Sequence, residues 1–268
     1  MKFKSLRLQF RFITMNYKLV IEFPSLILGG FIECIFAILA FFIFWQVVLV
    51  GQTFGSWQLQ EILVFSCFGY LGWGIASFFF TGVWEIPFKI IEGEIERWLC
   101  RPVKHPLLGV LSENVWVGGG AYVITGILLL GVIVPVYKIN ILFLNSLIAL
   151  LVMIFGMTAL YLLYGTITSL AGFTIGRIGF LEEAIFSMEE NFQKIPVTTL
   201  PLGLRTFLLV GFPVGMISAL PSEIFLGRIP IINSLGILVI SGVLAVIWAS
   251  LFIFVWNRGI KRYESASN

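Results

Sequence analysis

Glu33 is the residue of this sequence that is best placed to do chemistry in an apolar environment. It lies within residues 24–50, a stretch that contains no other charged side chain. A carboxylate at such a position costs about 2.5–3.5 kcal/mol on insertion scales, so it faces protein or water by default. It could form a proton- or cation-coupled site or contact a cationic substrate; the alternative is a structural carboxylate that pairs with a neighbouring helix or stays protonated. Coupled transporters usually carry several such residues, whereas Glu61 and Glu113 lie only at the edges of apolar stretches.

The remainder of the sequence lacks the residues that most enzymes use. All 14 acidic residues are Glu, which excludes aspartyl-phosphate pumps, aspartyl proteases and a Walker B motif that ends in Asp. The single His, His105, cannot form a two-histidine zinc site. Cys34, Cys67 and Cys100 lie far apart, and we expect neither a metal site nor a disulfide from them. Because no G-x-x-x-x-G-K-[ST] or G-x-S-x-G motif is present, we expect a chain that is not an enzyme and binds no cofactor.

The composition indicates an all-α integral membrane protein. Hydrophobic residues make up 59% of the chain and charged residues 12%, against about 45–50% and about 25% in soluble domains, and the mean hydropathy is +1.02. A bilayer core of ~30 Å requires ~20 apolar residues in a helix. Six stretches predict six transmembrane helices that together form one domain, residues 24–256: 24–50, 62–81, 114–137, 146–174, 204–221 and 231–256. The fifth is short, and Pro213 lies near its middle.

The distribution of Lys and Arg predicts the orientation. Six spans place both termini on one side of the membrane. The segments on that side hold 15 Lys and Arg residues, counting Arg205 at the edge of the fifth stretch, and the other side holds only Lys138 and Arg228. Cytoplasmic segments carry the excess of positive charge. We therefore expect a multi-pass protein with cytoplasmic termini, ending in a cytoplasmic tail, residues 257–268.

Two segments outside these spans have amphipathic patterns. Residues 1–23 place basic and apolar side chains on neighbouring stripes, which predicts an interfacial helix with its cations at the lipid headgroups; a disordered basic tail is the alternative. Residues 181–195 repeat apolar side chains at i, i+3, i+4 and i+7. The other side of that segment carries four carboxylates: Glu182, Glu183, Glu189 and Glu190. We expect this acidic side to face water or a basic protein surface.

The longest charged segment, residues 85–108, connects the second and third spans. Residues 90–100 suit a short helix that Pro102 stops shortly afterwards. This helix combines charges of both signs with Trp98 and Leu99. A short amphipathic helix with a protruding aromatic side chain is typical of a docking segment, and a solvated linker is the alternative.

Several short motifs occur in a characteristic order along the chain. The pattern G-x-I-x-x-x-L-x-R-P covers residues 93–102. It is followed by Ile195-Pro196-Val197, Leu204-Arg205, Phe212-Pro213-Val214, Leu220-Pro221-Ser222 and Lys261-Arg262-Tyr263-Glu264-Ser265-Ala266. With these motifs the chain resembles, over nearly its whole length, the permease subunits of export-class (type 2) ATP-binding-cassette transporters, and within them a bacterial subfamily formerly of unknown function. In most relatives Tyr stands at the position of Ile195.

The resemblance implies a role for each of these features. Residues 1–23 would be a connecting helix, residues 90–102 a coupling helix that binds a groove on the ATPase, and the fifth span would lead to a re-entrant outer segment around 221–230. The residues that would form the ATPase-coupling contact are Gly93, Glu94, Ile95, Glu96, Arg97, Trp98, Leu99, Arg101 and Pro102. The working unit would contain two ATPases, which bind ATP and Mg²⁺, and a second permease chain that is either a copy or a paralogue.

The resemblance also implies the bacterial cytoplasmic (inner) membrane as the location and export as the direction. Membrane lipids are expected partners and nucleic acid is not; the substrate is left open. The alternative function is a stand-alone channel or an ion-coupled secondary transporter that uses Glu33. It would be active without an ATPase and sensitive to Glu33→Gln.

Overall fold

The structure is a computed structural model that describes residues 14, 18, 22, 24–48, 55–101, 106–113, 116, 118–176 and 178–263. These residues form helices joined by turns, and no β-strand element occurs among them. The expected interfacial helix over residues 1–23 lies almost entirely outside the described residues. Pro102 and the last five residues of the chain also lie outside them.

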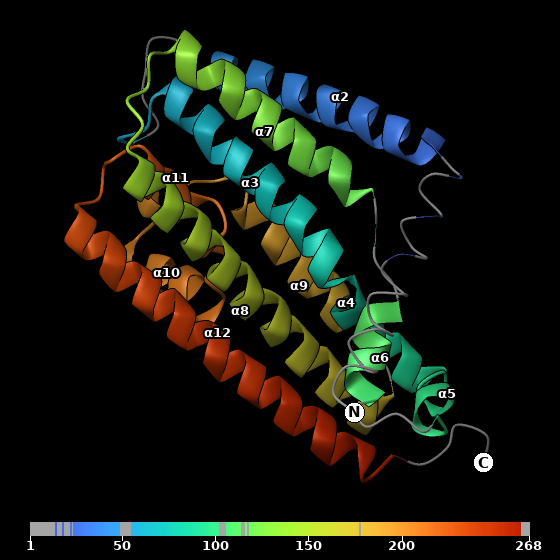
Figure 1. The fold of residues 1–268 in the computed structure, drawn as a ribbon. Helices are drawn as coiled ribbons and strands as arrows, with labels where there is room; N and C mark the ends of the chain where they lie inside the picture. The colour runs from blue at the N-terminus through green and yellow to red at the C-terminus, as the bar shows by residue number, and fades with distance from the viewer. Residues whose placement is uncertain are drawn as a thin grey trace.

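Five of the helices are long and apolar enough to cross a membrane. They are α2 (Pro24–Val48), α3 (Leu59–Phe79), α7 (Gly119–Val136), α8 (Phe143–Ile175) and α12 (Ile231–Ile260), and they form an elongated bundle (Figure 1). Each corresponds to one of the predicted spans, so five of the six predictions are confirmed as long apolar helices. Large apolar side chains of α2 and α12 remain exposed, among them Phe36 and Ile232, as expected of helices that face lipid.

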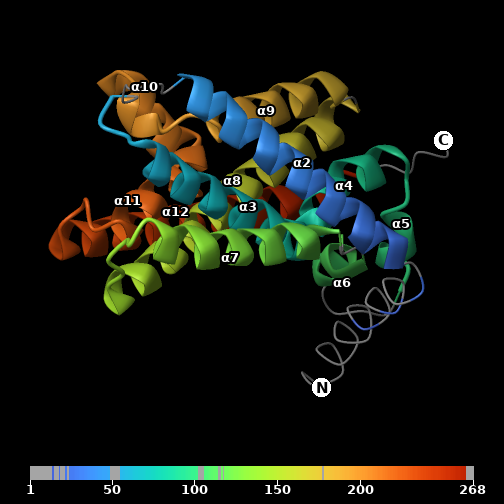
Figure 2. The same ribbon diagram turned by 90° about the horizontal axis from the view of Figure 1, so that it is seen from above.

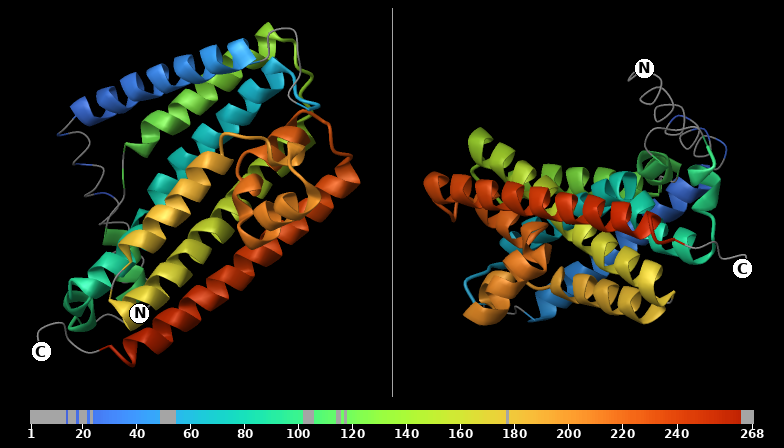
Figure 3. Two further views of the ribbon diagram at one scale, coloured as in Figure 1. Left: turned by 180° about the vertical axis from the view of Figure 1, so that it is seen from behind. Right: turned by 90° about the horizontal axis from the view of Figure 1, so that it is seen from below.

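Helices α8 and α12 lie side by side and run in the same direction. Gly165 of α8 lies against Phe252, and Phe173, two turns further on, packs against Trp256. The chain must therefore return along the bundle between them. Helix α9 (Gly179–Phe192) makes this return, antiparallel to α8, as Figure 3 shows in yellow. Viewed from above, α2 and α9 lie on the same side of the bundle (Figure 2).

The segment after α9 begins and ends at one end of the molecule. Thr198 accepts a hydrogen bond from the indole of Trp57 at 3.1 Å, and the guanidinium of Arg228 lies 4.8 Å from the same ring. Between them, two apolar helical pieces, Leu202–Gly211 and Pro213–Phe225, meet at an angle of 72°. They comprise α10 (Leu202–Thr206), a π-helical turn (Phe207–Gly211), a 3₁₀ turn (Pro213–Met216) and α11 (Ala219–Phe225).

Residues 204–221 therefore do not run the length of the bundle, as the predicted fifth span requires. Helix α9 and the residues that follow it make that passage, and the chain turns back on itself over 202–225 rather than around 221–230. The reason is that α9 has only 14 residues and carries four Glu, so its hydropathy is too low to mark a span. Hereafter, the end of the bundle at Trp57 is called the α11 end.

The opposite end, called the α5 end, carries three short helices: α4 (Thr81–Ile91), α5 (Glu96–Leu99) and α6 (Pro106–Glu113). The predicted continuous helix over 90–100 is not formed. Helix α4 extends to Ile91, and the chain then turns at Gly93, whose φ of 77° disfavours any residue with a Cβ. Only four residues, Glu96–Leu99, are helical after that turn.

A disulfide tests the placement of the segment after α9. A Cβ built on Gly55 lies 3.8 Å from the Cβ of Thr199, within the range of about 3.5–4.5 Å that a disulfide requires. The φ of 61° at Gly55 costs a residue with a Cβ about 1–2 kcal/mol, but it does not prevent the bond. We expect Gly55→Cys/Thr199→Cys, in a Cys100→Ser background, to cross-link on mild oxidation, seen as a loss of two reactive thiols. Each single variant serves as a control. If residue 199 lay on the side of the membrane opposite to residue 55, no cross-link would form.

Candidate docking segment and interhelical cavity

Residues 93–101 form a tight turn whose apolar side chains point into the protein. The backbone N–H of Ile95 donates to the carbonyl of Lys89 at 3.1 Å, which closes the turn after α4. Ile95 and Trp98 are both completely buried. They join an apolar cluster drawn from α4, α6 and α12: Val83, Ile86, Ile90, Val110, Phe252 and Trp256. Trp98 therefore does not protrude as predicted, because the cluster between these helices encloses its indole.

Gly109 of α6 makes room for the Trp98 ring. A Cβ at Gly109 would lie 2.4 Å from the indole, closer than any side chain tolerates. On the Arg101 side, the guanidinium lies 4.5 Å from the ring centroid, a distance at which a cation is attracted to the π face. The turn is thus held against α6 by the Trp98 ring, which packs on Gly109 and lies beneath the Arg101 guanidinium.

The charged residues of this segment remain accessible. Glu94, Arg97 and Arg101 are exposed, while Glu96 and Leu99 are half-buried. The hydroxyl of Tyr263, which follows α12, donates to Glu96 at 3.4 Å. Partial burial raises the pKa of Tyr263, and the Glu96 carboxylate adds to this rise. The structure therefore brings the predicted residues 93–101 together as charges of both signs on a fixed apolar base.

Glu33 has a partner on a neighbouring helix. Its carboxylate accepts a hydrogen bond of 2.9 Å from the hydroxyl of Tyr122 in α7, and the ring of Tyr122 stacks on Tyr70 of α3 at 6.1 Å. This pairing agrees with the structural alternative for Glu33. Within the described ranges, no group of three or more His, Cys, Asp or Glu side chains could hold a metal ion.

A cavity of about 960 Å³ lies between α2, α3 and α9. Its lining from α2, α3 and α7 is almost entirely apolar or aromatic: Ala40, Phe44, Trp45, Val48, Phe65, Ser66, Gly69, Tyr70, Trp73 and Tyr122. Helix α9 and the residues after it contribute the charged and amide side chains together with two apolar ones: Phe186, Glu189, Glu190, Asn191, Gln193, Lys194 and Ile195. The cavity could not be predicted from the sequence, because it forms only when α9 lies beside α3.

The sequence predicted that Glu189 lies on a solvated face, and the structure places it in the protein interior instead. Its exposed fraction is 4%, and its Oε1 accepts hydrogen bonds from the hydroxyl of Tyr161 and from the Gln193 amide at 2.9 Å. Glu190 is exposed and pairs with Lys194 at 2.7 Å. Glu182 accepts a weaker bond, 3.3 Å, from Tyr164. The acidic side of α9 is thus divided: Glu189 lies in the protein interior, Glu182 is half-buried, and Glu183 and Glu190 are exposed, as the sequence predicted for the whole side.

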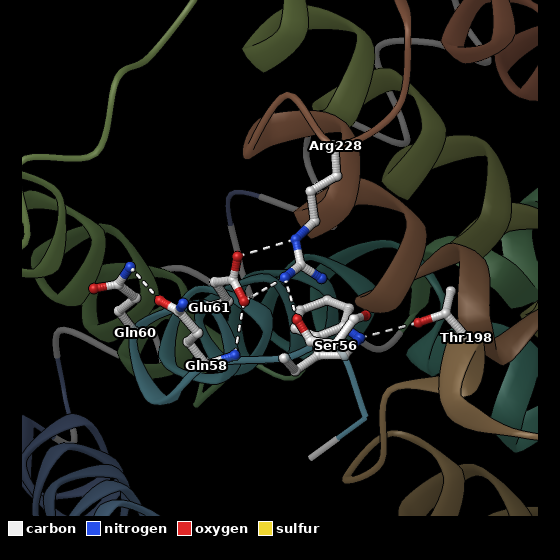
Figure 4. A network of polar contacts seen from close by, with 7 residues as sticks. Ser56, Gln58, Gln60, Glu61, Thr198 and Arg228 are labelled. Carbon is white, nitrogen blue, oxygen red and sulfur yellow. Dashed lines mark hydrogen bonds and ion pairs between the residues drawn. The ribbon is translucent and has the colours of Figure 1, made fainter. Parts of the chain in front are cut away.

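A polar network closes the α11 end of the molecule (Figure 4). The Arg228 guanidinium forms a two-nitrogen ion pair with Glu61, one bond of which is 3.0 Å, and donates to the carbonyl of Ser56 at 2.6 Å. It also lies over the ring of Trp57, which is bonded to Thr198. These contacts join the beginning of α3, the segment after α9 and the turn before α12. The sequence did not indicate this pairing, because Glu61 and Arg228 are 167 residues apart.

Comparison with known proteins yields one match. A family model described as ABC-2 family transporter protein matches residues 31–267. No curated protein matches the chain, and neither does any solved structure.

Proposed function

Because this multi-pass membrane protein belongs to the ABC-2 family of transporter proteins, we propose that it is the permease subunit of an ATP-binding-cassette exporter. ATP and Mg²⁺ bind to separate ATPase subunits, two in each transporter, and the permease acts together with a second permease chain, a copy or a paralogue. Residues 93–101 form the surface that contacts the ATPase. The observation that carries this proposal is the set of exposed charges at Glu94, Arg97 and Arg101 on the fixed base of Ile95 and Trp98.

The α5 end is the cytoplasmic end in this proposal. The corrected position of the fifth crossing moves Lys194 and Arg205 toward the α11 end, which changes the expected distribution from 15 against two to 13 against four. One of those four, Arg228, is neutralised by Glu61. The excess of positive charge thus remains at the α5 end, which favours cytoplasmic termini in a bacterial inner membrane.

The apolar base of the docking segment provides a route for mechanical coupling. Trp98 belongs to the same buried cluster as Phe252 and Trp256 of α12, and only one residue separates the end of α3 from the start of α4. Packed interiors have few voids and transmit displacement rather than absorb it. A movement of the ATPase that displaces α5 therefore displaces α3 and α12, and with α3 one wall of the cavity between α2, α3 and α9.

Charge reversal tests the docking surface. We expect Glu94→Lys and Arg97→Glu each to weaken association with the ATPase by about tenfold or more, since like charges then face one another across the contact. The measurement is co-purification of the ATPase with tagged permease, with transport assayed in parallel.

The matched control is Lys138→Glu, a charge reversal of an exposed residue at the α11 end. It should leave association unchanged. If both reversals at the α5 end retained full association and transport, residues 93–101 would not be the contact with the ATPase.

A further inference from the structure

The cavity between α2, α3 and α9 combines the size of a small-molecule site with walls rich in aromatic rings. Its volume of about 960 Å³ lies at the upper end of the range of roughly 300–1,000 Å³ that is usual for sites of drug-sized ligands. Seven rings line it from four helices: Phe44, Trp45, Phe65, Tyr70, Trp73, Tyr122 and Phe186. Faces of aromatic rings carry negative charge density and attract cations, Trp most strongly.

The described charged side chains of the cavity lining do not cancel, because two are carboxylates and one is basic. Glu190 is neutralised by Lys194 in an i, i+4 ion pair. Glu189 is the second carboxylate of the lining, and both hydrogen bonds that it accepts from described residues go to Oε1. Its Oε2 receives no hydrogen bond from the described part of the chain. One carboxylate oxygen of the lining is therefore left for a ligand.

A carboxylate in such a place has an energetic need for a cation. Removal of a charge from water is costly unless the charge is paired, and ionisable groups within a membrane domain are typically functional. Two hydrogen bonds offset part of the cost for Glu189, and an arriving cation would favour its ionised form further. An anion would be repelled by the same group. A neutral acyl chain would fill the apolar volume but leave Oε2 without a partner.

We propose that this cavity binds amphipathic organic cations, with the cationic centre at Glu189 and the apolar or aromatic part against Trp45, Tyr70 and Trp73. This inference rests on the proposed function, because it names the class of substrate for the path that the permease provides. Lys194 acts as an internal competitor in this arrangement, since it is the one basic residue among the described residues of the lining and contributes a like charge.

A pair of ions with the same shape and opposite charge provides the test. Tetraphenylphosphonium and tetraphenylborate are measured for binding to the full-length permease in nanodiscs, with empty nanodiscs as the background. We expect the cation to bind at least about tenfold more tightly than the anion, and Glu189→Gln to weaken cation binding by about tenfold. Lys194→Gln should strengthen cation binding, a gain that a misfolded protein could not show.

The matched control is Glu182→Gln on the same helix, because Glu182 bonds to Tyr164 and does not line the cavity. It should change cation binding less than about twofold. Equal binding of the two ions, or equal losses in Glu189→Gln and Glu182→Gln, would overturn the inference. Co-purification of the ATPase separates the two proposals. If the ATPase associates but the two ions bind alike, only the proposed cation site is contradicted. If binding is charge-selective but no ATPase associates, only the proposed coupling to the ATPase is contradicted.

Discussion

Replacement of Trp98 by alanine should destabilise the α5 end and abolish ATPase association, although this side chain does not reach the surface. The indole is completely buried among α4, α6 and α12, and removal of a large aromatic side chain from a core costs about 3–5 kcal/mol. Gly109 would then face an empty space, and Arg101 would lose the ring that it lies on. Thermal unfolding in detergent and co-purification of the ATPase measure the two effects.

The control is Trp116→Ala, which removes an indole that is 43% exposed. It should cost clearly less than Trp98→Ala, since nearly half of the Trp116 surface is exposed and contributes no buried area. Arg97→Glu is the complementary variant: it should lose association while it keeps the thermal stability of the unaltered protein. If Trp98→Ala unfolded at the same temperature as the parent, the buried cluster would not support the docking segment.

The long spans could be predicted because the bilayer imposes a length and a composition that a sequence displays directly. Helices α3, α8 and α12 begin within three residues of the predicted stretches or at their first residue. The crossing at α9 could not be found in this way. Its four Glu lower the mean hydropathy, and the burial of Glu189 depends on Tyr161, which belongs to a different helix 28 residues earlier.

The amphipathic pattern of residues 181–195 predicts one side of α9 correctly. Ile185, Met188 and Phe192 do pack against the apolar core, as their spacing indicates. Periodicity reports which side of a helix is apolar, but it does not report whether a polar side meets water, a hydroxyl group or a cavity. For α9 the polar side meets the hydroxyls of Tyr161 and Tyr164 and the cavity.

The docking segment illustrates a related limit. Charges of both signs near Trp98 were recognised in the sequence, and three of them are exposed in the structure. Whether the ring itself is a surface contact or an anchor is decided by α6, through the absence of a side chain at Gly109. A glycine in an apolar helix has many possible causes, so its role as the partner of an indole 11 residues earlier is not visible before the helices are packed.

Replacement of Arg228 by methionine is expected to destabilise the α11 end by about 2–3 kcal/mol. The side chain of Glu61 is only 15% exposed, so the substitution leaves a largely buried carboxylate without its cation, a loss of about 3–5 kcal/mol for fully buried pairs that partial exposure reduces. The substitution also removes the bond to the Ser56 carbonyl and the contact with Trp57. Thermal unfolding of the detergent-solubilised protein measures the effect, and Lys138→Met, at an exposed residue of the same end, should cost less than about 0.5 kcal/mol.

A double-mutant cycle with Glu61→Gln shows whether this cost arises from the ion pair or from packing. If the unpaired carboxylate dominates, Arg228→Met combined with Glu61→Gln should be more stable than Arg228→Met alone, because the neutral amide no longer needs a cation. Glu61→Gln keeps one carbonyl oxygen that can accept the hydrogen bond from the backbone N–H of Gln58, but the bond to Ser56 and the contact with Trp57 stay lost, so recovery should be incomplete. Strictly additive costs would mean that Arg228 acts through Trp57 and Ser56 instead.

In either case, a weakened network should release the segment around Thr198 from α3, and the Gly55→Cys/Thr199→Cys cross-link should then form more slowly in the Arg228→Met background.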